Sequence, residues 1–218
     1  MVERVYRRAA AARGVSGVLV ATDDARIAAA VAGFGGAFVM TRPDHASGTD
    51  RVAEAARGLS CDLVVNVQGD EPALDPAAIE AAVAPLSADA SLMMGTLGAP
   101  LDPDVDFQNP NTVKVLLDRQ GNALYFSRAP VPYRREAGEA LTPVLRHVGL
   151  YVYRREFLLT LASLPRTPLE RIESLEQLRA LEHGFRIRVV ETAYASISVD
   201  TAEDLERVRR LAADGLLA

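Results

Sequence analysis

An apolar segment of the chain ends directly in polar residues at positions 65–72 (Val-Asn-Val-Gln-Gly-Asp-Glu-Pro). The apolar part is typical of a strand buried on both faces, and ligands of open α/β sheets bind beyond the carboxyl ends of such strands. Gly69 would let a ligand approach the backbone, and the carboxylate of Asp70 could hold Mg²⁺ against phosphate oxygens. The alternative is a turn whose acidic groups are solvated or cap the next helix.

A second acidic residue, Asp200, stands between a predicted strand and a predicted helix. An aspartate directly before a helix can cap it, and this role would explain Asp200 without any metal. However, Mg²⁺ in nucleotide sites takes one or two carboxylates together with phosphate oxygens. Asp70 and Asp200, 130 residues apart in the sequence, fit this need if their strands are neighbours.

Residues 41–51 (Thr-Arg-Pro-Asp-His-Ala-Ser-Gly-Thr-Asp-Arg) form a polar loop between a predicted strand and a predicted helix. Ser47 and Gly48 combine small side chains with accessible backbone groups, which could read a nucleotide base through main-chain hydrogen bonds. The alternative is an ordinary loop in which Thr49 or Ser47 caps the helix.

Residues 146–153 (Arg-His-Val-Gly-Leu-Tyr-Val-Tyr) predict a strand with His147, Gly149 and Tyr151 on one face. A single strand histidine is more often a satisfied core residue than a ligand. Residues 175–179 (Leu-Glu-Gln-Leu-Arg) belong to a predicted amphipathic helix, in which Glu176 and Gln177 would ordinarily lie at the surface.

Helical and strand patterns alternate along most of the chain. We expect helices at residues 2–12, 25–32, 49–57, 76–83, 155–163, 173–181 and 201–212, and strands at 17–22, 37–40, 62–67, 91–97, 112–117, 123–127, 146–153 and 186–191. This alternation predicts an α/β fold with an open, mostly parallel sheet and helices on both faces. The turn at residues 118–122 adds a small antiparallel hairpin appendage. One domain over residues 1–218 accounts for the length.

Composition excludes several classes of protein. The net charge is −5, and Lys114 is the only lysine among the 24 basic residues, with no basic tract of the kind that binds nucleic acid. The longest uncharged run, residues 27–41, has 15 residues, whereas a membrane span needs about 20 apolar residues. The single cysteine, Cys61, excludes an internal disulfide framework. We therefore expect a cytoplasmic protein.

Together and in this order, these motifs resemble those of the 3-deoxy-manno-octulosonate cytidylyltransferases, also called CMP-Kdo synthetases. The resemblance covers essentially the whole chain, and the related acylneuraminate enzymes would not be expected to carry the full set. Besides the segments above, the matches are residues 20–24 (Val-Ala-Thr-Asp-Asp), 107–115 (Phe-Gln-Asn-Pro-Asn-Thr-Val-Lys-Val), 123–129 (Ala-Leu-Tyr-Phe-Ser-Arg-Ala) and 199–206 (Val-Asp-Thr-Ala-Glu-Asp-Leu-Glu).

The resemblance implies a nucleotide-diphospho-sugar transferase-like fold that transfers CMP from CTP to the 3-deoxy sugar acid Kdo, with Mg²⁺ and release of pyrophosphate. It implies a metal-binding, catalytic pair of Asp70 and Asp200, and a hairpin arm at about residues 112–133 that forms a homodimer. The product would serve lipopolysaccharide biosynthesis. Around the cytidine would lie Ser47, Gly48, Arg51 and Gln68. The sugar-acid pocket would be lined by His147, Tyr151, Glu176, Gln177 and Arg128, with Arg128 as the partner of the carboxylate.

The start of the sequence departs from this family pattern. Family members begin with a strand and an Arg- and Lys-bearing loop that holds the triphosphate, whereas this sequence starts at the helix that follows. Each missing preorganised donor of this kind costs about 3–4 kcal/mol. One alternative is therefore a catalytically impaired, truncated remnant that only dimerises or binds sugar acid. A metal-dependent glycosyltransferase is another, because it shares the carboxylate–Mg²⁺ chemistry.

Overall fold

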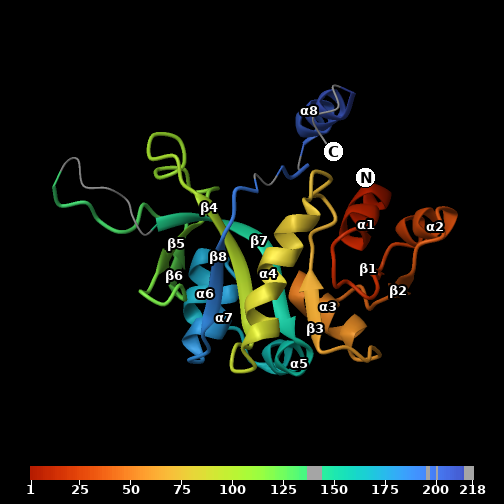
Figure 1. Ribbon diagram of the computed structural model, residues 1–218, viewed down its shortest axis with the longest axis horizontal. Coiled ribbons are helices and arrows are strands. Elements are labelled where there is room, and N and C mark those ends of the chain that lie inside the picture. Colours follow the sequence, from red (N-terminus) through yellow and green to blue (C-terminus); the bar gives the residue numbers. More distant parts are fainter. Residues whose placement is uncertain (137–143, 195–196, 200, 214–218) are drawn as a thin grey trace. The chain divides into compact units, whose positions relative to one another are not determined.

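The computed structural model describes residues 1–136, 144–194, 197–199 and 201–213 (Figure 1). Contacts within the chain divide it into two compact units. The first unit comprises residues 1–59, 66–80 and 194–218, and the second comprises residues 60–65 and 81–193.

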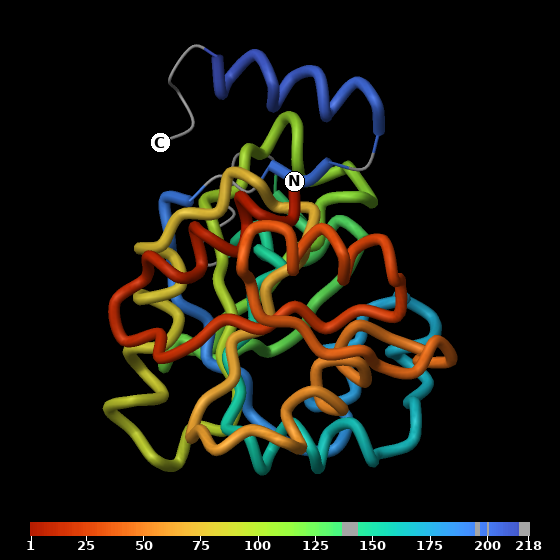
Figure 2. Tube along the Cα trace, turned by 90° about the vertical axis from the view of Figure 1, so that its right-hand side faces the viewer, coloured from red at the N-terminus to blue at the C-terminus, as the bar shows by residue number. Residues whose placement is uncertain are grey.

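The first unit contains a pair of short parallel strands with helices packed against them. Strand β1 pairs with β2 so that Val20 lies opposite Phe38 and Thr22 opposite Met40. Helix α2 contacts both strands, and α1 lies beside α2 in both views (Figures 1 and 2). The elements that lie wholly in this unit are α1 (Val2–Ala10), β1 (Val20–Thr22), α2 (Ala25–Gly33), β2 (Phe38–Met40), α3 (Gly48–Ala56) and α8 (Ala202–Ala213).

Two helices of the first unit, α2 and α8, begin at side chains that cap free backbone N–H groups, which is why their starts could be predicted from sequence. Asp24 precedes α2, and its Oδ1 accepts a hydrogen bond from the backbone N–H of Arg26 at 2.7 Å. Thr201 precedes α8 and makes a reciprocal pair of bonds with Asp204. The Thr201 hydroxyl accepts from the Asp204 N–H at 3.1 Å, and Asp204 Oδ2 accepts from the Thr201 N–H at 2.9 Å.

A mixed sheet forms the second unit, in the strand order β6-β5-β7-β4-β8, with β3 also pairing with β7. Its strands are β3 (Leu63–Asn66), which ends in the first unit, β4 (Met94–Pro100), β5 (Lys114–Leu117), β6 (Ala123–Ser127), β7 (Val144–Arg154) and β8 (Ile187–Glu191). The β4–β8 pair is parallel, whereas β4–β7, β5–β7 and β5–β6 are antiparallel. The α/β fold class is confirmed, with a larger antiparallel part than expected because the β5–β6 hairpin joins the sheet through β7.

The helices of the second unit differ from prediction where distant residues decide their ends. The unit holds α5 (Arg155–Ser163), with its predicted bounds, α6 (Pro168–Glu173), α7 (Gln177–Glu182) and most of α4 (Pro76–Ala88). Helix α4 continues past its predicted end because Arg154 of β7 donates to the carbonyls of Leu86, at 2.7 Å, and Asp89, at 3.0 Å. The helix predicted at residues 173–181 is interrupted at Ser174, whose φ of 53° is left-handed.

A buried ion pair joins α6 to α7. Arg179 donates from Nε to Glu170 Oε2 at 2.9 Å and from Nη2 to Oε1 at 2.6 Å, and the side chains are only 4% and 1% exposed. The same carboxylate accepts from the backbone N–H of Thr167 at 3.1 Å, which closes the start of α6. Because α7 begins with Gln177, this pair holds one of the predicted site residues in place.

Replacement of Arg179 by Met should lower the free energy of unfolding by about 3–5 kcal/mol, because it leaves the buried Glu170 carboxylate without its buried partner and with only the more exposed Arg166 at 3.2 Å. Urea unfolding measures the change. Arg209→Met is the matched control, since Arg209 pairs with Glu206 at the surface and such pairs contribute about 1 kcal/mol or less. Equal effects of the two substitutions would show that the buried pair does not stabilise this region.

Candidate active site

The turn that follows β3 holds the first predicted metal ligand. Asp70 is half-buried, and within the described part of the chain its carboxylate has no hydrogen-bond or ion-pair partner. Its backbone carbonyl accepts a hydrogen bond from the Val199 N–H at 3.0 Å. Asp200, the second predicted ligand, lies outside the described residues, but this bond brings the residue before it next to Asp70. The pairing of the Asp70 and Asp200 carboxylates stays a prediction, and the contact between Val199 and Asp70 agrees with it.

Further hydrogen bonds involve the residues beside Asp70 and beside Asp200. Glu71 accepts a hydrogen bond from the Tyr194 hydroxyl at 2.7 Å, which links the turn to the chain that leads toward Asp200. Gln68 is exposed, and its carbonyl accepts from the Glu71 N–H at 3.4 Å. Because Thr201 caps α8, the helix cap that would have explained Asp200 without a metal is provided by another residue.

The predicted nucleotide loop at residues 41–51 is held by its own side chains. Ser47 caps α3, since its hydroxyl accepts from the Asp50 N–H at 3.2 Å. Arg51 donates from Nη1 to the Thr41 hydroxyl at 2.7 Å and lies 3.2 Å from Asp23. The capping alternative is thus present for Ser47. A cytidine contact of Ser47 or Arg51 stays a prediction.

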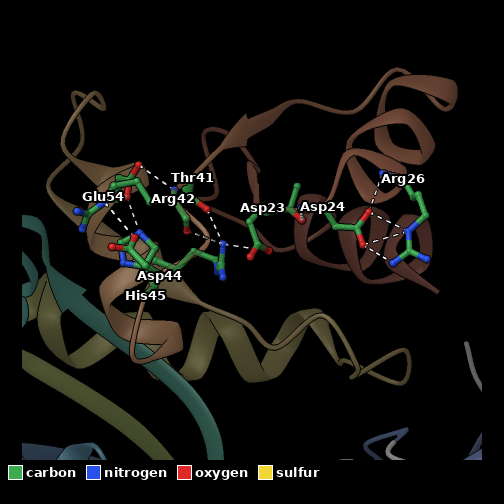
Figure 3. A network of polar contacts seen from close by, with 10 residues as sticks. Asp23, Asp24, Arg26, Thr41, Arg42, Asp44, His45 and Glu54 are labelled. Carbon is green, nitrogen blue, oxygen red and sulfur yellow. Dashed lines mark hydrogen bonds and ion pairs between the residues drawn. The ribbon is translucent and has the colours of Figure 1, made fainter.

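A second carboxylate organises the other end of this loop. Glu54 of α3 accepts hydrogen bonds from the Arg42 backbone N–H and guanidinium, both at 3.3 Å, and from Nε2 of His45 (Figure 3). These bonds leave Gly48 at the start of α3, where a side chain in place of its hydrogen would meet no atom within 4 Å. A ligand could therefore approach the backbone at Gly48 without meeting another part of the chain.

Aromatic rings surround His147 on β7. The His147 ring centroid lies 5.1 Å from that of Phe126 and 5.4 Å from that of Tyr151, so His147 and Tyr151 share a face of the strand. Burial lowers the pKa of His147 to about 3. Burial, with smaller effects of Tyr153 and Glu176, raises the pKa of Tyr151 well above its ordinary value. Both side chains are therefore neutral at physiological pH, and the carboxylate of Glu176 lies close enough to Tyr151 to influence its ionisation.

Gln177, the first residue of α7, carries an unused donor. The residue is 4% exposed, and its Nε2 is buried with no hydrogen-bond partner among the described residues. A buried amide without a partner costs about 1–3 kcal/mol, so the fold gains nothing from this group as it stands. Sequence reasoning treated this position as ordinarily a surface residue, and the structure corrects that reading.

Two carbonyl oxygens and one backbone bond fix the orientation of Arg128. Its Nε donates to the carbonyl of Glu173 at 2.9 Å, and its Nη1 donates to the carbonyl of Pro110 at 3.1 Å. The Glu173 carboxylate accepts from the Arg128 backbone N–H at 2.9 Å. Sequence reasoning missed Glu173, because a glutamate near a helix end looks like a solvated surface residue.

The predicted site residues are divided between the two units. The first unit holds Asp70, Ser47, Gly48, Arg51 and Gln68, and the second holds Arg128, His147, Tyr151, Glu176 and Gln177. No cluster of three or more His, Cys, Asp or Glu suited to a metal occurs in the described ranges. Over those ranges, no helix is long and apolar enough to cross a membrane.

Comparison with known proteins identifies the family. The cytidylyltransferase family model matches residues 1–188. A 3-deoxy-manno-octulosonate cytidylyltransferase from Syntrophotalea carbinolica is 58% identical in an alignment of length 215 that covers 95% of this chain and 86% of the relative. One from Geobacter sulfurreducens is 54% identical over 95% of this chain and 87% of the relative. The chain belongs to the 3-deoxy-manno-octulosonate cytidylyltransferase family.

Solved structures agree with this membership. A CMP:2-keto-3-deoxy-manno-octonic acid synthetase complexed with CTP is 43% identical and superposes with a TM-score of 0.93 over 98% of this chain and 88% of its own. A 4-diphosphocytidyl-2C-methyl-D-erythritol synthase from Anaerococcus prevotii, with 12% identity, a TM-score of 0.63 and coverage of 97% of this chain and 88% of its own, shares the fold alone. None of these comparisons favours the impaired-remnant alternative.

The low pKa of His147 predicts how stability depends on pH. Between about 3, its folded pKa, and about 6.5, its ordinary value, the unfolded chain binds the proton and the folded chain does not. The free energy of unfolding should therefore fall as the pH is lowered through this window, by at most about 1.4 kcal/mol per pH unit from this group.

Urea unfolding at several pH values between 3 and 7 measures this dependence. We expect a flatter profile for His147→Gln than for the unchanged chain, whereas His183→Gln keeps the contribution of His147 and serves as the matched control. Parallel profiles for the unchanged chain and His147→Gln would contradict the assignment.

Proposed function

We propose that the chain catalyses the reaction of CTP with 3-deoxy-manno-octulosonate to give CMP-Kdo and pyrophosphate. The anomeric hydroxyl oxygen of the sugar acid forms a bond to the α-phosphorus of CTP and loses its proton, and the bond to the pyrophosphate oxygen breaks. Family membership at 43–58% identity supports this reaction. The observation in the chain itself that supports it most directly is the buried Nε2 of Gln177, which has no hydrogen-bond partner among the described residues.

The donors and acceptors of the second unit match a polyhydroxylated acid. Arg128 is oriented by two carbonyl oxygens and would pair with the substrate carboxylate. Gln177 would donate to a substrate oxygen, and Glu176 would accept from a hydroxyl. The rings of His147 and Tyr151 would pack against the carbon skeleton.

The first unit would bind CTP through Ser47, Gly48, Arg51 and Gln68. The open backbone at Gly48 supports this part of the proposal, and the bond between Arg51 and Thr41 would keep the loop in one conformation when the base binds. A preorganised loop loses less conformational entropy on binding.

We propose that Mg²⁺ is the metal and that Asp70 and Asp200 hold it. The carboxylate of Asp70, which is half-buried and has no partner among the described residues, fits such an ion, because Mg²⁺ in nucleotide sites takes one or two carboxylates and completes its shell with phosphate oxygens. When bound, the ion would neutralise charge on the phosphates and on the departing pyrophosphate. The bond between Val199 and the Asp70 carbonyl would hold the two segments together.

Further parts of the proposal concern assembly and place in the cell. We propose a homodimer formed through the arm at about residues 112–133, supported by Leu124, which is 61% exposed on the edge strand β6. Analytical ultracentrifugation tests it. CTP as substrate supports action in the cytoplasm, and CMP-Kdo as product supports a part in lipopolysaccharide biosynthesis.

Pyrophosphate release with CTP, Kdo and Mg²⁺ tests the reaction. We expect release that requires all three components and that is much weaker with N-acetylneuraminate in place of Kdo. The assay is run on the chain as given and on a version extended by the strand and phosphate loop typical of family members. No release from either chain would overturn the proposed reaction, and release from the extended chain alone would assign the loss to those parts.

Asp70→Asn should lower kcat/KM at least 100-fold, which corresponds to about 3 kcal/mol of transition-state stabilisation, because an amide lacks the charge that holds Mg²⁺. Thermal unfolding should stay normal. Asp62→Asn is the control, since Asp62 is also an aspartate next to β3 but is exposed and outside the proposed site. Turnover of Asp70→Asn close to that of the unchanged chain would remove Asp70 from the site.

Gln177→Leu should raise the KM for Kdo about tenfold, the effect of one lost hydrogen bond, while the KM for CTP stays unchanged. The variant should be at least as stable as the unchanged chain, because leucine removes a buried amide that has no partner. Steady-state kinetics and urea unfolding are measured together. An unstable variant with an unchanged KM for Kdo would show that Gln177 serves the fold and does not bind substrate.

A further inference from the structure

Thr96 of β4 is fully buried, and its hydroxyl lies among three polar atoms of β7. The Oγ1 atom lies 2.8 Å from the Leu150 carbonyl oxygen, 3.2 Å from the Val148 carbonyl oxygen and 3.0 Å from Nε2 of His147. A break in the register of the β4–β7 pair produces this arrangement. Thr96 is opposite Tyr151, and the next residue, Leu97, is opposite Val148, so two extra residues of β7 bulge there and both flanking carbonyls approach one hydroxyl.

This geometry determines the tautomer of His147. A threonine hydroxyl has one hydrogen, and carbonyl oxygens only accept. If the hydroxyl donated to Nε2, its oxygen would lie against two carbonyl oxygens with no hydrogen between them. The hydroxyl therefore donates to the carbonyls, and Nε2–H of His147 donates to the hydroxyl.

The other ring nitrogen of His147 then carries a free lone pair. The ring is neutral at physiological pH, as its lowered pKa indicates, so only one nitrogen carries a hydrogen. Nδ1 has no hydrogen-bond partner within the described residues. A hydroxyl group is the natural donor for such a lone pair, and the proposed substrate carries several hydroxyl groups.

We propose that Thr96 is a positioning residue of the sugar-acid site, which holds His147 in its Nε2–H tautomer so that Nδ1 accepts a hydrogen bond from a substrate hydroxyl. The identity of the substrate rests on the proposed function, whereas the tautomer does not. Ordinary packing of a buried threonine would not select one tautomer, so the tautomer separates a positioning role from a purely structural one.

Nitrogen-15 NMR of the imidazole rings in the full chain tests the tautomer directly. The chain has three histidines, and loss of a signal in His147→Gln assigns His147. His183 is an internal reference, because its Nδ1 lies 2.8 Å from the Arg179 carbonyl and must donate there. We expect His147 to show a protonated Nε2 and a bare Nδ1, and His183 to show a protonated Nδ1.

Addition of Kdo alone, without CTP, tests the acceptor. We expect the Nδ1 signal of His147 to move on saturation, while the signals of His183 stay in place. A protonated Nδ1 or a mixture of tautomers in the unchanged chain overturns the proposal. So does an Nδ1 signal that does not move when other backbone signals of the second unit show that the sugar acid has bound.

Kinetics of two substitutions complete the test. Thr96→Val removes the hydroxyl at nearly constant volume and should raise the KM for Kdo about tenfold, with the KM for CTP unchanged and with mixed tautomers of His147. Thr96→Ser keeps the hydroxyl and should restore both the KM and the tautomer. Thr160→Val, on the exposed side of α5, is the matched control.

The outcomes separate this inference from the proposed function. An unchanged KM for Kdo in Thr96→Val overturns the positioning role even if the enzyme makes CMP-Kdo. If His147 has the expected tautomer but the chain neither turns over nor binds Kdo, the proposed substrate is overturned, and the acceptor role of Nδ1 with it. The tautomer measurement on the unchanged chain holds even if Thr96→Val does not fold.

Discussion

The second unit depends on one buried positive charge. Lys114 on β5 is completely buried, and its ammonium group donates to three backbone carbonyls: Asn109 at 2.9 Å, Thr112 at 2.7 Å and Arg128 at 2.7 Å. Burial lowers the pKa of Lys114, and the three carbonyl oxygens compensate for the lost water. Because an ammonium group has three hydrogens, this one is fully used. It joins the loop before β5 to the end of β6.

The position of Arg128 follows from this charge. Lys114 holds the Arg128 carbonyl, while the Glu173 carboxylate accepts from the Arg128 N–H at 2.9 Å and from the Ser127 hydroxyl at 2.6 Å. The backbone of Arg128 is thus fixed from both sides. Its guanidinium is then directed by the carbonyls of Glu173 and Pro110. The proposed role of Arg128 as the partner of a carboxylate would need this support, because a long flexible side chain would otherwise lose much rotamer entropy on binding.

Local rules of sequence predicted much of this fold. The starts of α2, α5 and α8, the turn between β5 and β6, and the glycine after α7 depend on residues only a few positions apart. What sequence did not reveal comes from partners distant along the chain. Arg154 extends α4 from 68 residues away, the bulge in β7 places two carbonyls around Thr96, and Glu173 orients Arg128 from a helix 45 residues later.

The predicted site residues were named from motifs, but the motifs did not separate residues that support the candidate site from residues with hydrogen-bonding capacity left for a ligand. The hydrogen bonds that each side chain already makes separate these two kinds of residue. Ser47 and Arg51 use part of their hydrogen-bonding capacity to hold the loop, Ser47 as the acceptor for the Asp50 N–H and Arg51 through Nη1 to Thr41 and Asp23. In contrast, the buried amide of Gln177 lacks a partner in the described part of the chain.

A buried polar group without a hydrogen-bond partner lowers the stability of the fold. Three groups lack a hydrogen-bond or ionic partner among the described residues: the Asp70 carboxylate, Nε2 of Gln177 and Nδ1 of His147. Each is of the chemical type that its proposed ligand requires, namely a carboxylate for a cation, an amide donor for an oxygen, and a lone pair for a hydroxyl. The first lies in one unit and the other two in the second. This agrees with the proposed reaction of a metal-bound nucleotide with a polyhydroxylated acid, since each proposed substrate would bring the hydrogen-bonding or charged partner that the described residues do not supply.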